Sequence, residues 1–150
     1  MTREPPPVSL RPATEDDVPF LLTLREQTMT EHFRASGVEV SSEQHLLRLR
    51  VRFECAQIIE HEGRPAGIFK AARDGLSWEL IQIQLTPELQ GRGVGERLIR
   101  RLMDDAERAG ATLSLNVLHA NPARRLYERL GFQTVTDAEH MYVMRWPARA

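Results

Sequence analysis

The fold is decided by residues 82–95, which read Gln82-Ile83-Gln84-Leu85-Thr86-Pro87-Glu88-Leu89-Gln90-Gly91-Arg92-Gly93-Val94-Gly95. A strand is expected from Trp78 to Leu85, and Pro87, which cannot donate to a ladder, closes it. Three glycines follow, and apolar side chains then recur at helical spacing up to a stop at Gly110. The stretch therefore predicts a strand that passes through a glycine turn directly into an amphipathic helix.

The glycine turn, residues 90–95, has the features of an anion-binding site. The first turn of a helix carries unpaired backbone N–H groups and a partial positive charge. Glycines have no Cβ, so these donors can approach phosphate oxygens closely, and Arg92 adds a charge beside them. A P-loop needs Lys and Ser or Thr after its last glycine, and a dinucleotide fingerprint needs a small residue where Glu96 stands. The turn therefore predicts a pyrophosphate site that is neither a P-loop nor a dinucleotide-binding turn. The alternative is a turn that binds no ligand.

Upstream of the turn, the pattern predicts an antiparallel meander. Residues 56–61, 65–73 and 78–85 read as strands. Glu62-Gly63 and Asp74-Gly75 are typical hairpin turns between them.

The N-terminal part is expected to hold an edge strand and two helices. Val8 to Arg11 reads as the strand, and Thr14 with Asp17 imitates a capping box before a helix that Gly37 ends. Ser41 or Ser42 caps a second helix to about Arg52, whose Arg48, Arg50 and Arg52 are interpreted as a solvated face.

The C-terminal part predicts a strand, a helix and a final hairpin. Leu113 to Val117 is the strand. Asn121-Pro122 opens a helix with Pro in its first turn, and Gly131 is its left-handed stop. Strands follow at about 133–136 and 140–146. The chain thus has a mixed α/β order with one strand–helix–strand crossover between residues 78 and 117.

Composition limits the classes of function. The chain has 150 residues, the length of one domain of roughly 100–200 residues. Lys and Arg number 20 against 21 Asp and Glu, so a nucleic-acid partner is not expected. No apolar run approaches the ~20 residues of a membrane span, and no signal peptide or zinc-like Cys/His spacing is visible. With Cys55 as its single cysteine, the chain is expected in a reducing compartment, the cytoplasm, of a bacterium whose arginine-rich usage suggests a GC-rich genome.

Three segments together resemble the GNAT superfamily of acetyl-CoA-dependent N-acetyltransferases. Residues 90–95 fit its Gln/Arg-x-x-Gly-x-Gly/Ala signature. Residues 121–132, Asn-Pro-Ala-Arg-Arg-Leu-Tyr-Glu-Arg-Leu-Gly-Phe, look like its last conserved helix, and residues 11–17 resemble its first strand and helix start. The resemblance implies one domain over residues 1–150, with a core at about 8–146. It implies an α/β (α+β) fold with a mixed, mostly antiparallel sheet of about seven strands, about four helices and a V-shaped split between strands 4 and 5.

The resemblance also implies where acetyl-CoA binds, without a metal. Main-chain groups of Ile83, Gln84 and Leu85 would pair with the pantetheine arm as an added strand does. Asn121 would contact the arm from the other side. The turn that starts at Gln90 would hold the pyrophosphate on the amides of Gly91, Arg92, Gly93, Val94, Gly95 and Glu96.

Two catalytic residues are implied by the same resemblance. Tyr127 falls on the tyrosine that faces the thioester sulfur, where a phenol can protonate the departing thiolate; the alternative is a packing role on the apolar helix face. Glu79 falls on the glutamate base of the histone-acetylating branch; a solvated strand residue is its alternative, with ordered water, His32 or His119 as other bases. A bulge in the strand would change whether Gln82 and Gln84 face the substrate.

The resulting hypothesis is an N-acetyltransferase in which a primary amine attacks acetyl-CoA directly in a ternary complex. The acceptor is a small molecule or a peptide, selected by residues 16–52 and the final hairpin, and a homodimer is left open. The alternative function is a regulatory module of the same fold that binds acyl-CoA without turnover.

Overall fold

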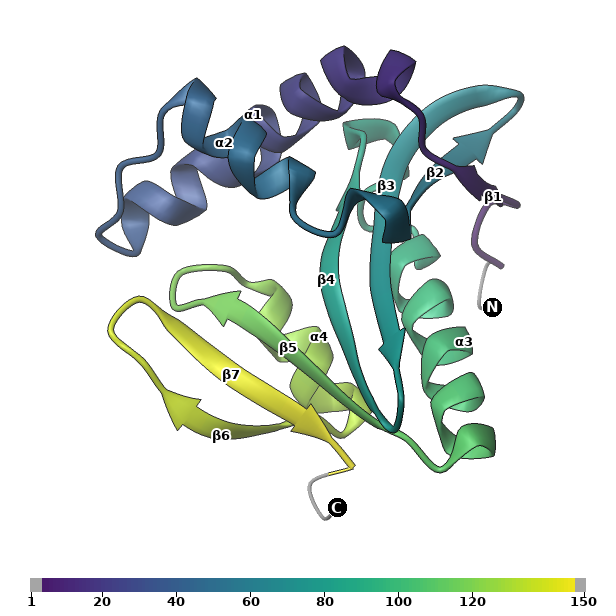
Figure 1. The fold of residues 1–150 in the computed structure, drawn as a ribbon, viewed down its shortest axis with the longest axis vertical. Helices are drawn as coiled ribbons and strands as arrows, with labels where there is room; N and C mark the ends of the chain where they lie inside the picture. Colours follow the sequence, from purple (N-terminus) through teal and green to yellow (C-terminus); the bar gives the residue numbers. More distant parts are fainter. Residues whose placement is uncertain (1–3, 148–150) are drawn as a thin grey trace.

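The computed structural model describes residues 4–147 and contains one seven-stranded sheet with helices on both faces (Figure 1). The strands are β1 (Ser9–Pro12), β2 (Ala56–His61), β3 (Arg64–Asp74), β4 (Ser77–Leu85), β5 (Thr112–Leu118), β6 (Gln133–Asp137) and β7 (Met141–Trp146). The helices are α1 (Val18–Ala35), α2 (Ser42–Arg50), α3 (Val94–Ala109) and α4 (Ala123–Leu130), with short 3-10 turns η1 (Glu15–Asp17), η2 (Phe53–Cys55) and η3 (Pro87–Leu89).

The predicted fold class is confirmed, including the split in the sheet. The strand order is β1-β2-β3-β4-β5-β7-β6, and every neighbouring pair is antiparallel except β4 and β5. Those two parallel strands are in register only from Ser77 opposite Thr112 to Glu79 opposite Ser114. Beyond that point they diverge as a V, and α1 and α2 lie at its open end (Figure 1).

Three helix ends differ from the sequence prediction. The Thr14 capping box is present but starts the turn η1, and α1 begins only at Val18. Helix α2 ends at Arg50 rather than near Arg52, because Val51 is extended and Arg52 is left-handed with φ +52°. Pro122 lies at the N-cap of α4 rather than inside its first turn.

The sheet is covered by a different core on each face. On one face α3 packs its buried Leu98, Ile99 and Leu102 against Leu113 and Leu115 of β5. On the other face a smaller core joins the helices α1 and α2 to β2 and β3 through Leu21, Leu49, Ile58 and Ile68. A buried strand side chain therefore packs either on the face that α3 covers or on the face that α1 and α2 cover.

A β-bulge in β4 changes which residues face which side. Leu80 is opposite Ala71 and Gln82 is opposite Lys70, so Ile81 is the extra residue of the bulge. Trp78 and Leu80 pack on the α3 side before it, whereas Ile83 and Leu85 pack there after it. Glu79, Gln82 and Gln84 consequently all face α1 and α2.

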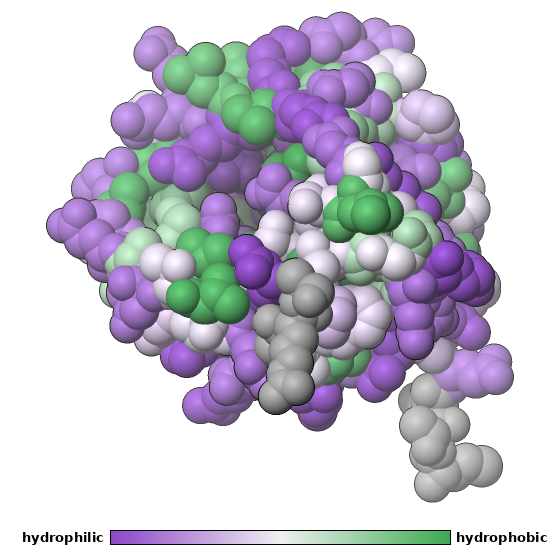
Figure 2. Space-filling model, turned by 60° about the horizontal axis from the view of Figure 1, so that its bottom comes forward, coloured by the Kyte–Doolittle hydropathy of each residue, from purple (hydrophilic) through white to green (hydrophobic). Residues whose placement is uncertain are grey.

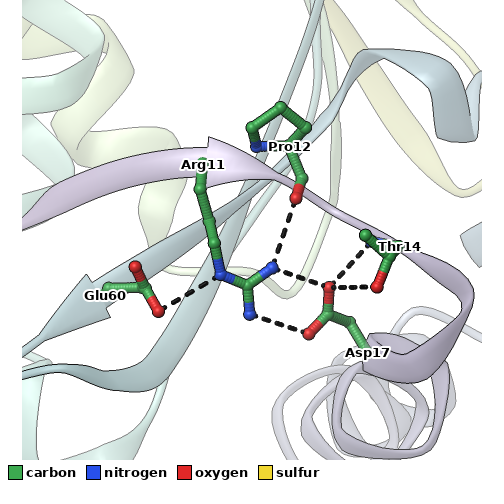
Figure 3. A network of polar contacts seen from close by, with 5 residues as sticks. All are labelled: Arg11, Pro12, Thr14, Asp17 and Glu60. Carbon is green, nitrogen blue, oxygen red and sulfur yellow. Dashed lines mark hydrogen bonds and ion pairs between the residues drawn. The ribbon is translucent and has the colours of Figure 1, made fainter.

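A polar network fixes the start of α1 (Figure 3). Arg11 of β1 donates from Nη1 and Nη2 to the two carboxylate oxygens of Asp17, both at 2.9 Å, and from Nε to Glu60 at 3.2 Å. The backbone N–H of Thr14 also donates to Asp17, at 2.8 Å. The hydrogen bonds from Arg11 lower the pKa of the Asp17 carboxyl, so the pair stays charged near neutral pH.

The only lysine of the chain, Lys70, fixes the end of α2. Its side chain is fully buried, and Nζ donates to the carbonyl oxygens of Leu49 and Val51, both at 2.7 Å. These carbonyls lie at the last turn of the helix, where backbone acceptors lack intrahelical partners. Burial lowers the pKa of Lys70 to about 8, with the charge of Arg25 as the next cause.

The face of the molecule in Figure 2 is mostly polar. Hydrophilic side chains predominate on the face in Figure 2, and the apolar ones form small separate groups. Of the helices within residues 4–147, none has the length and apolar character of a membrane span.

The buried ammonium predicts a pH-dependent stability. The folded pKa of Lys70, about 8, lies below the unfolded value of about 10.4, so the unfolded chain binds more protons between these values. Raising the pH from 7 to 10 should therefore raise the free energy of unfolding of the wild type relative to Lys70→Met, by about 1–3 kcal/mol. Urea titrations of both proteins across this range measure the difference. A difference that does not change with pH would contradict the assignment.

Candidate active site

Two cavities meet at the split between β4 and β5. The helix-side cavity, about 310 Å³, is lined by α1, α2, β4 and β5. The turn-side cavity, about 750 Å³, is lined by the glycine turn and by residues of α1, α3 and α4. Residues that line both cavities mark their junction; they are Met29, Ile83, Gln84, Asn121 and Tyr127.

The glycine turn has the geometry that the sequence predicted. Gly91 and Gly93 adopt left-handed backbones with φ +71° and +84°, and Gly93 is the N-cap of α3. The first helical hydrogen bond runs from the N–H of Arg97 to the carbonyl of Gly93. The amides of residues 94–96 therefore have no partner within the helix and lie beside the turn-side cavity. This is the arrangement that an anion requires.

Side chains of the glycine turn and of the first turn of α3 form hydrogen bonds that stabilise its conformation. Gln90 donates from Nε2 to the carbonyl oxygen of Leu85 at 2.9 Å, and Arg92 donates from Nη1 to that of Glu88 at 3.3 Å. The carboxylate of Glu96 accepts from Arg129 of α4 at 2.7 Å and from Arg100 at 3.2 Å. These hydrogen bonds, that from Arg129 first, lower the pKa of Glu96 and leave its charge paired.

A third hollow lies on the other side of the glycine turn. Its volume is about 860 Å³, and four arginines line it: Arg92, Arg97, Arg100 and Arg101. Only Arg92 was singled out by the sequence. The other three lie on the exposed face of a helix, where their spacing is that of any solvated stripe. The carboxylates of Glu4, Glu96 and Asp104 line the same hollow, so its charged side chains leave a small positive excess beside the turn.

Tyr127 lies at the junction of the two cavities. Its side chain is 7% exposed, and its ring makes an edge contact with Phe132 at 5.9 Å between centroids. Burial raises the pKa of the phenol to about 12, which keeps it protonated near neutral pH. The hydroxyl makes no hydrogen bond to any other described residue. Tyr127 is therefore both packed and available as a proton donor.

Glu79, Gln82 and Gln84 line the helix-side cavity together because of the bulge. Gln82 donates from Nε2 to Oε1 of Gln84, both side chains being buried. Within residues 4–147 the buried Oε1 of Gln82 has no hydrogen-bond partner.

Asn121 lies at the same junction, directly before the N-cap residue Pro122 of α4. Its Oδ1 accepts from the backbone N–H of Ala123 at 2.9 Å, which orients the side chain at the start of the helix. Asn121 and Tyr127 thus come from one helix end, opposite the edge of β4.

Of the other residues that the sequence offered as candidates for catalysis, only His32 lines one of the two cavities. His32 lines the turn-side cavity. His119 is 2.9 Å from a carboxylate oxygen of Asp137, stacks on Tyr142, and lines neither cavity at the split. Cys55 is half-buried in η2, with Nη2 of Arg52 at 3.5 Å. Among the described side chains, no group of three or more His, Cys, Asp and Glu is placed to hold a metal ion.

Two residues of the helix-side cavity were not recognised from the sequence. Arg25 of α1 is 7% exposed and Arg48 of α2 is exposed, and both line the cavity. The sequence pattern alone places Arg48 on a solvated face, which the structure corrects. The one available signal is that Arg25 follows Leu21 by four positions, on the apolar face of its helix.

The family comparison agrees with this geometry. The model of the acetyltransferase (GNAT) family matches residues 19–132, which include the glycine turn and Tyr127.

Curated relatives match about two fifths of the chain. A GCN5-like protein acetyltransferase of Mycobacterium tuberculosis, Rv2170, is 38% identical over 65 residues, 42% of this chain and 32% of that protein. The ribosomal protein bS18-alanine N-acetyltransferase of Escherichia coli K12 is 40% identical over 65 residues, 42% of this chain and 44% of that enzyme. The match thus spans less than half the length of each relative.

Solved structures share the whole fold. The PaiA N-acetyltransferase of Thermoplasma acidophilum, solved with coenzyme A, superposes with a TM-score of 0.71 over 93% of this chain and 98% of that one, at 15% identity. Since the family model covers most of the chain and the fold agrees over nearly all of it, the chain belongs to the acetyltransferase (GNAT) family.

Proposed function

We propose that the protein is an N-acetyltransferase that moves the acetyl group of acetyl-CoA to a primary amine. The observation that carries the proposal is the junction of the two cavities, where Tyr127 lies between the glycine turn on one side and Glu79 on the other. A site of this form receives a phosphorylated donor from one side and an acceptor from the other. Residues 1–150 are proposed to act as one domain with a core at about residues 8–146.

The turn-side cavity is the proposed site of the co-substrate. The amides of Gly91 through Glu96 receive the pyrophosphate, and the arginine-lined hollow beside them suits further phosphate. Beyond Glu79 the edge of β4 is not paired with β5, so main-chain groups of residues 83–85, apart from the Leu85 carbonyl that accepts from Gln90, are available to an extended pantetheine arm. The coenzyme A in the PaiA structure supports the choice of co-substrate.

Direct transfer requires two proton movements. The acceptor amine must lose a proton, and Glu79, on the helix-side cavity, accepts it directly or through water. The neutral amine nitrogen bonds to the thioester carbonyl carbon as this proton leaves it, and the carbon–sulfur bond breaks. Tyr127 donates its phenolic proton to the departing sulfur and recovers it from solvent afterwards. Its raised pKa keeps the proton in place until the thiolate forms.

The acceptor is proposed to enter the helix-side cavity. The names of the bS18-alanine N-acetyltransferases support a peptide N-terminus as one class of acceptor, and a small-molecule amine is the other. The rival function is a regulatory module that binds acyl-CoA without turnover. The open junction beside Tyr127 favours the enzyme. Measuring thiol release from acetyl-CoA across a panel of amines and peptides tests it: tight acetyl-CoA binding with no release above background would favour the rival.

The first prediction concerns the glycine turn. A Cβ at Gly95 would lie 3.6 Å from Cδ1 of Ile83, an ordinary contact, so Gly95→Ala should bind acetyl-CoA almost normally. Gly95→Leu should overfill the space between α3 and β4, at about 1–3 kcal/mol. We expect its Kd for acetyl-CoA to rise at least about tenfold in calorimetric titration. Equal affinities in the two variants would place the co-substrate elsewhere.

The second prediction concerns Tyr127. Tyr127→Phe keeps the ring and its contact with Phe132 but removes the proton donor. We expect kcat to fall by about 10²–10⁴-fold, with the Kd for acetyl-CoA and the Tm nearly unchanged. Stopped-flow measurement of the chemical step is the decisive readout. A variant with the wild-type rate for that step would reduce Tyr127 to a packing residue.

The third prediction concerns Glu79. Glu79→Gln keeps the size of the side chain and removes its capacity to accept a proton. We expect kcat/KM to fall by about 10²-fold or more and the acidic limb of its pH profile to disappear. The pH profile of the wild type is the control. An acidic limb that persists in the variant would assign the base to another group.

A further inference from the structure

The helix-side cavity contains cations that no carboxylate neutralises. Arg25 of α1 and Arg48 of α2 line it, and Lys70 lies close enough for the charge of Arg25 to affect it. Within residues 4–147, none of the three has a carboxylate oxygen within the 4.0 Å of an ion pair. The arginines that follow along the chain behave differently: Arg50 pairs with Glu15 at 3.0 Å, and Arg52 with Asp74 at 2.8 Å.

Arg25 is the most unusual of these groups. Its side chain is more than nine-tenths buried, and its Nε has no hydrogen-bond partner among the described residues. Its guanidinium carbon lies 6.0 Å from the ring centroid of Phe33, and that of Arg48 lies 4.8 Å from the same centroid. Burial, and then the charge of Arg48, lower the pKa of Arg25 to about 10, so it is still charged at neutral pH. Burying an unpaired charge is costly.

The opposite wall of the cavity presents an acceptor without a donor. The Oε1 of Gln82 is buried and unpartnered within the described residues, and Glu79 lines the same wall. One wall therefore offers unused positive donors and the other offers oxygen acceptors. The ligand that complements both is a molecule with an anionic group at one end and an amine at the other.

The size of the cavity restricts that ligand. Its volume, about 310 Å³, is at the lower end of ligand pockets, roughly 300–1,000 Å³. Guanidinium groups pair best with planar oxyanions, which they bind with two parallel hydrogen bonds. Because the amine must reach the junction beside Tyr127, its anion takes the part of the cavity that Arg25 and Arg48 line, outside that junction.

We propose that the acceptor is a small primary amine that carries a carboxylate, held by Arg25 and Arg48 while its amine faces Glu79 and Gln82. This rests on the proposed acetyl transfer and adds the chemical class of its acceptor. Arg25 is a specificity-determining residue, and Arg48 supplements it from the exposed side.

The test compares short α- and ω-amino acids with their primary amides, which keep the amine and remove the negative charge. We expect kcat/KM for the acids to exceed that for the amides by about 30-fold or more, as for other buried charge pairs. In Arg25→Gln this preference should disappear, because the acids lose activity and the amides do not. Arg50→Gln, on the same helix as Arg48 but outside the cavity, should keep the preference within about threefold.

A binding measurement separates this inference from the proposed function. Calorimetry of the amino acids with the complex of protein and coenzyme A needs no turnover, and Arg25→Gln should abolish the acid preference there as well. Absence of acetylation together with this preference would reject the enzyme but support the carboxylate site. Equal binding of acids and amides, or equal losses of both in Arg25→Gln, would overturn the inference.

Two further measurements complete the test. Because the buried Nε of Arg25 has no hydrogen-bond partner among the described residues, Arg25→Met should keep or raise the Tm, whereas a structural arginine would lower it. The second measurement compares acetylation rates of free amino acids with those of peptides that carry an acidic residue after the N-terminus, with amidated peptides as controls. It shows whether the carboxylate belongs to a free amino acid or to a peptide side chain. Faster acetylation of the acidic peptides than of every free amino acid would overturn the small-molecule acceptor.

Discussion

The parallel pairing of β4 with β5 ends after Glu79 and Ser114, and the rest of the site depends on that separation. Each strand is followed by a helix, and the carboxyl ends of neighbouring parallel strands lie at the same edge of a sheet. The N-termini of α3 and α4 are therefore brought to one gap, the first with the glycine turn and the second with Asn121 and Tyr127. If the strands stayed paired to their ends, side chains and backbone hydrogen bonds would fill the junction where the two cavities now meet.

The bulge at Ile81 is the second constraint, because it decides what faces the gap. In a regular strand Glu79 and Gln82 would point to opposite sides of the sheet. One extra residue places them on the same side and also keeps Ile83 and Leu85 packed toward α3. A proposed base and two buried amides are thus collected on a wall without loss of the core behind it.

On the α1–α2 side of the sheet, two positively charged side chains are buried near the site, which costs free energy of solvation. Lys70 is fully buried and compensated by two carbonyls, whereas the buried Nε of Arg25 has no described partner. Arg11, which holds β1 to the start of α1, differs from Arg25 because it forms ion pairs with the carboxylates of Asp17 and Glu60. The difference between Arg11 and Arg25 is the basis on which Arg25 is proposed to bind a ligand.

The sequence by itself determined the order of the elements, the glycine turn and the position of Tyr127 on its helix, because turns, caps and helical periodicity are local properties. It also indicated that a bulge would matter for Gln82 and Gln84, but not whether one is present, since a bulge is defined by the partner strand. Arg48 was indistinguishable from Arg50 and Arg52, because all three are exposed arginines in the last turn of α2 or just after it. Only the tertiary structure decided that Arg50 and Arg52 meet carboxylates while Arg25 and Arg48 meet a cavity: the partners come from segments distant in sequence, and their distances follow from packing.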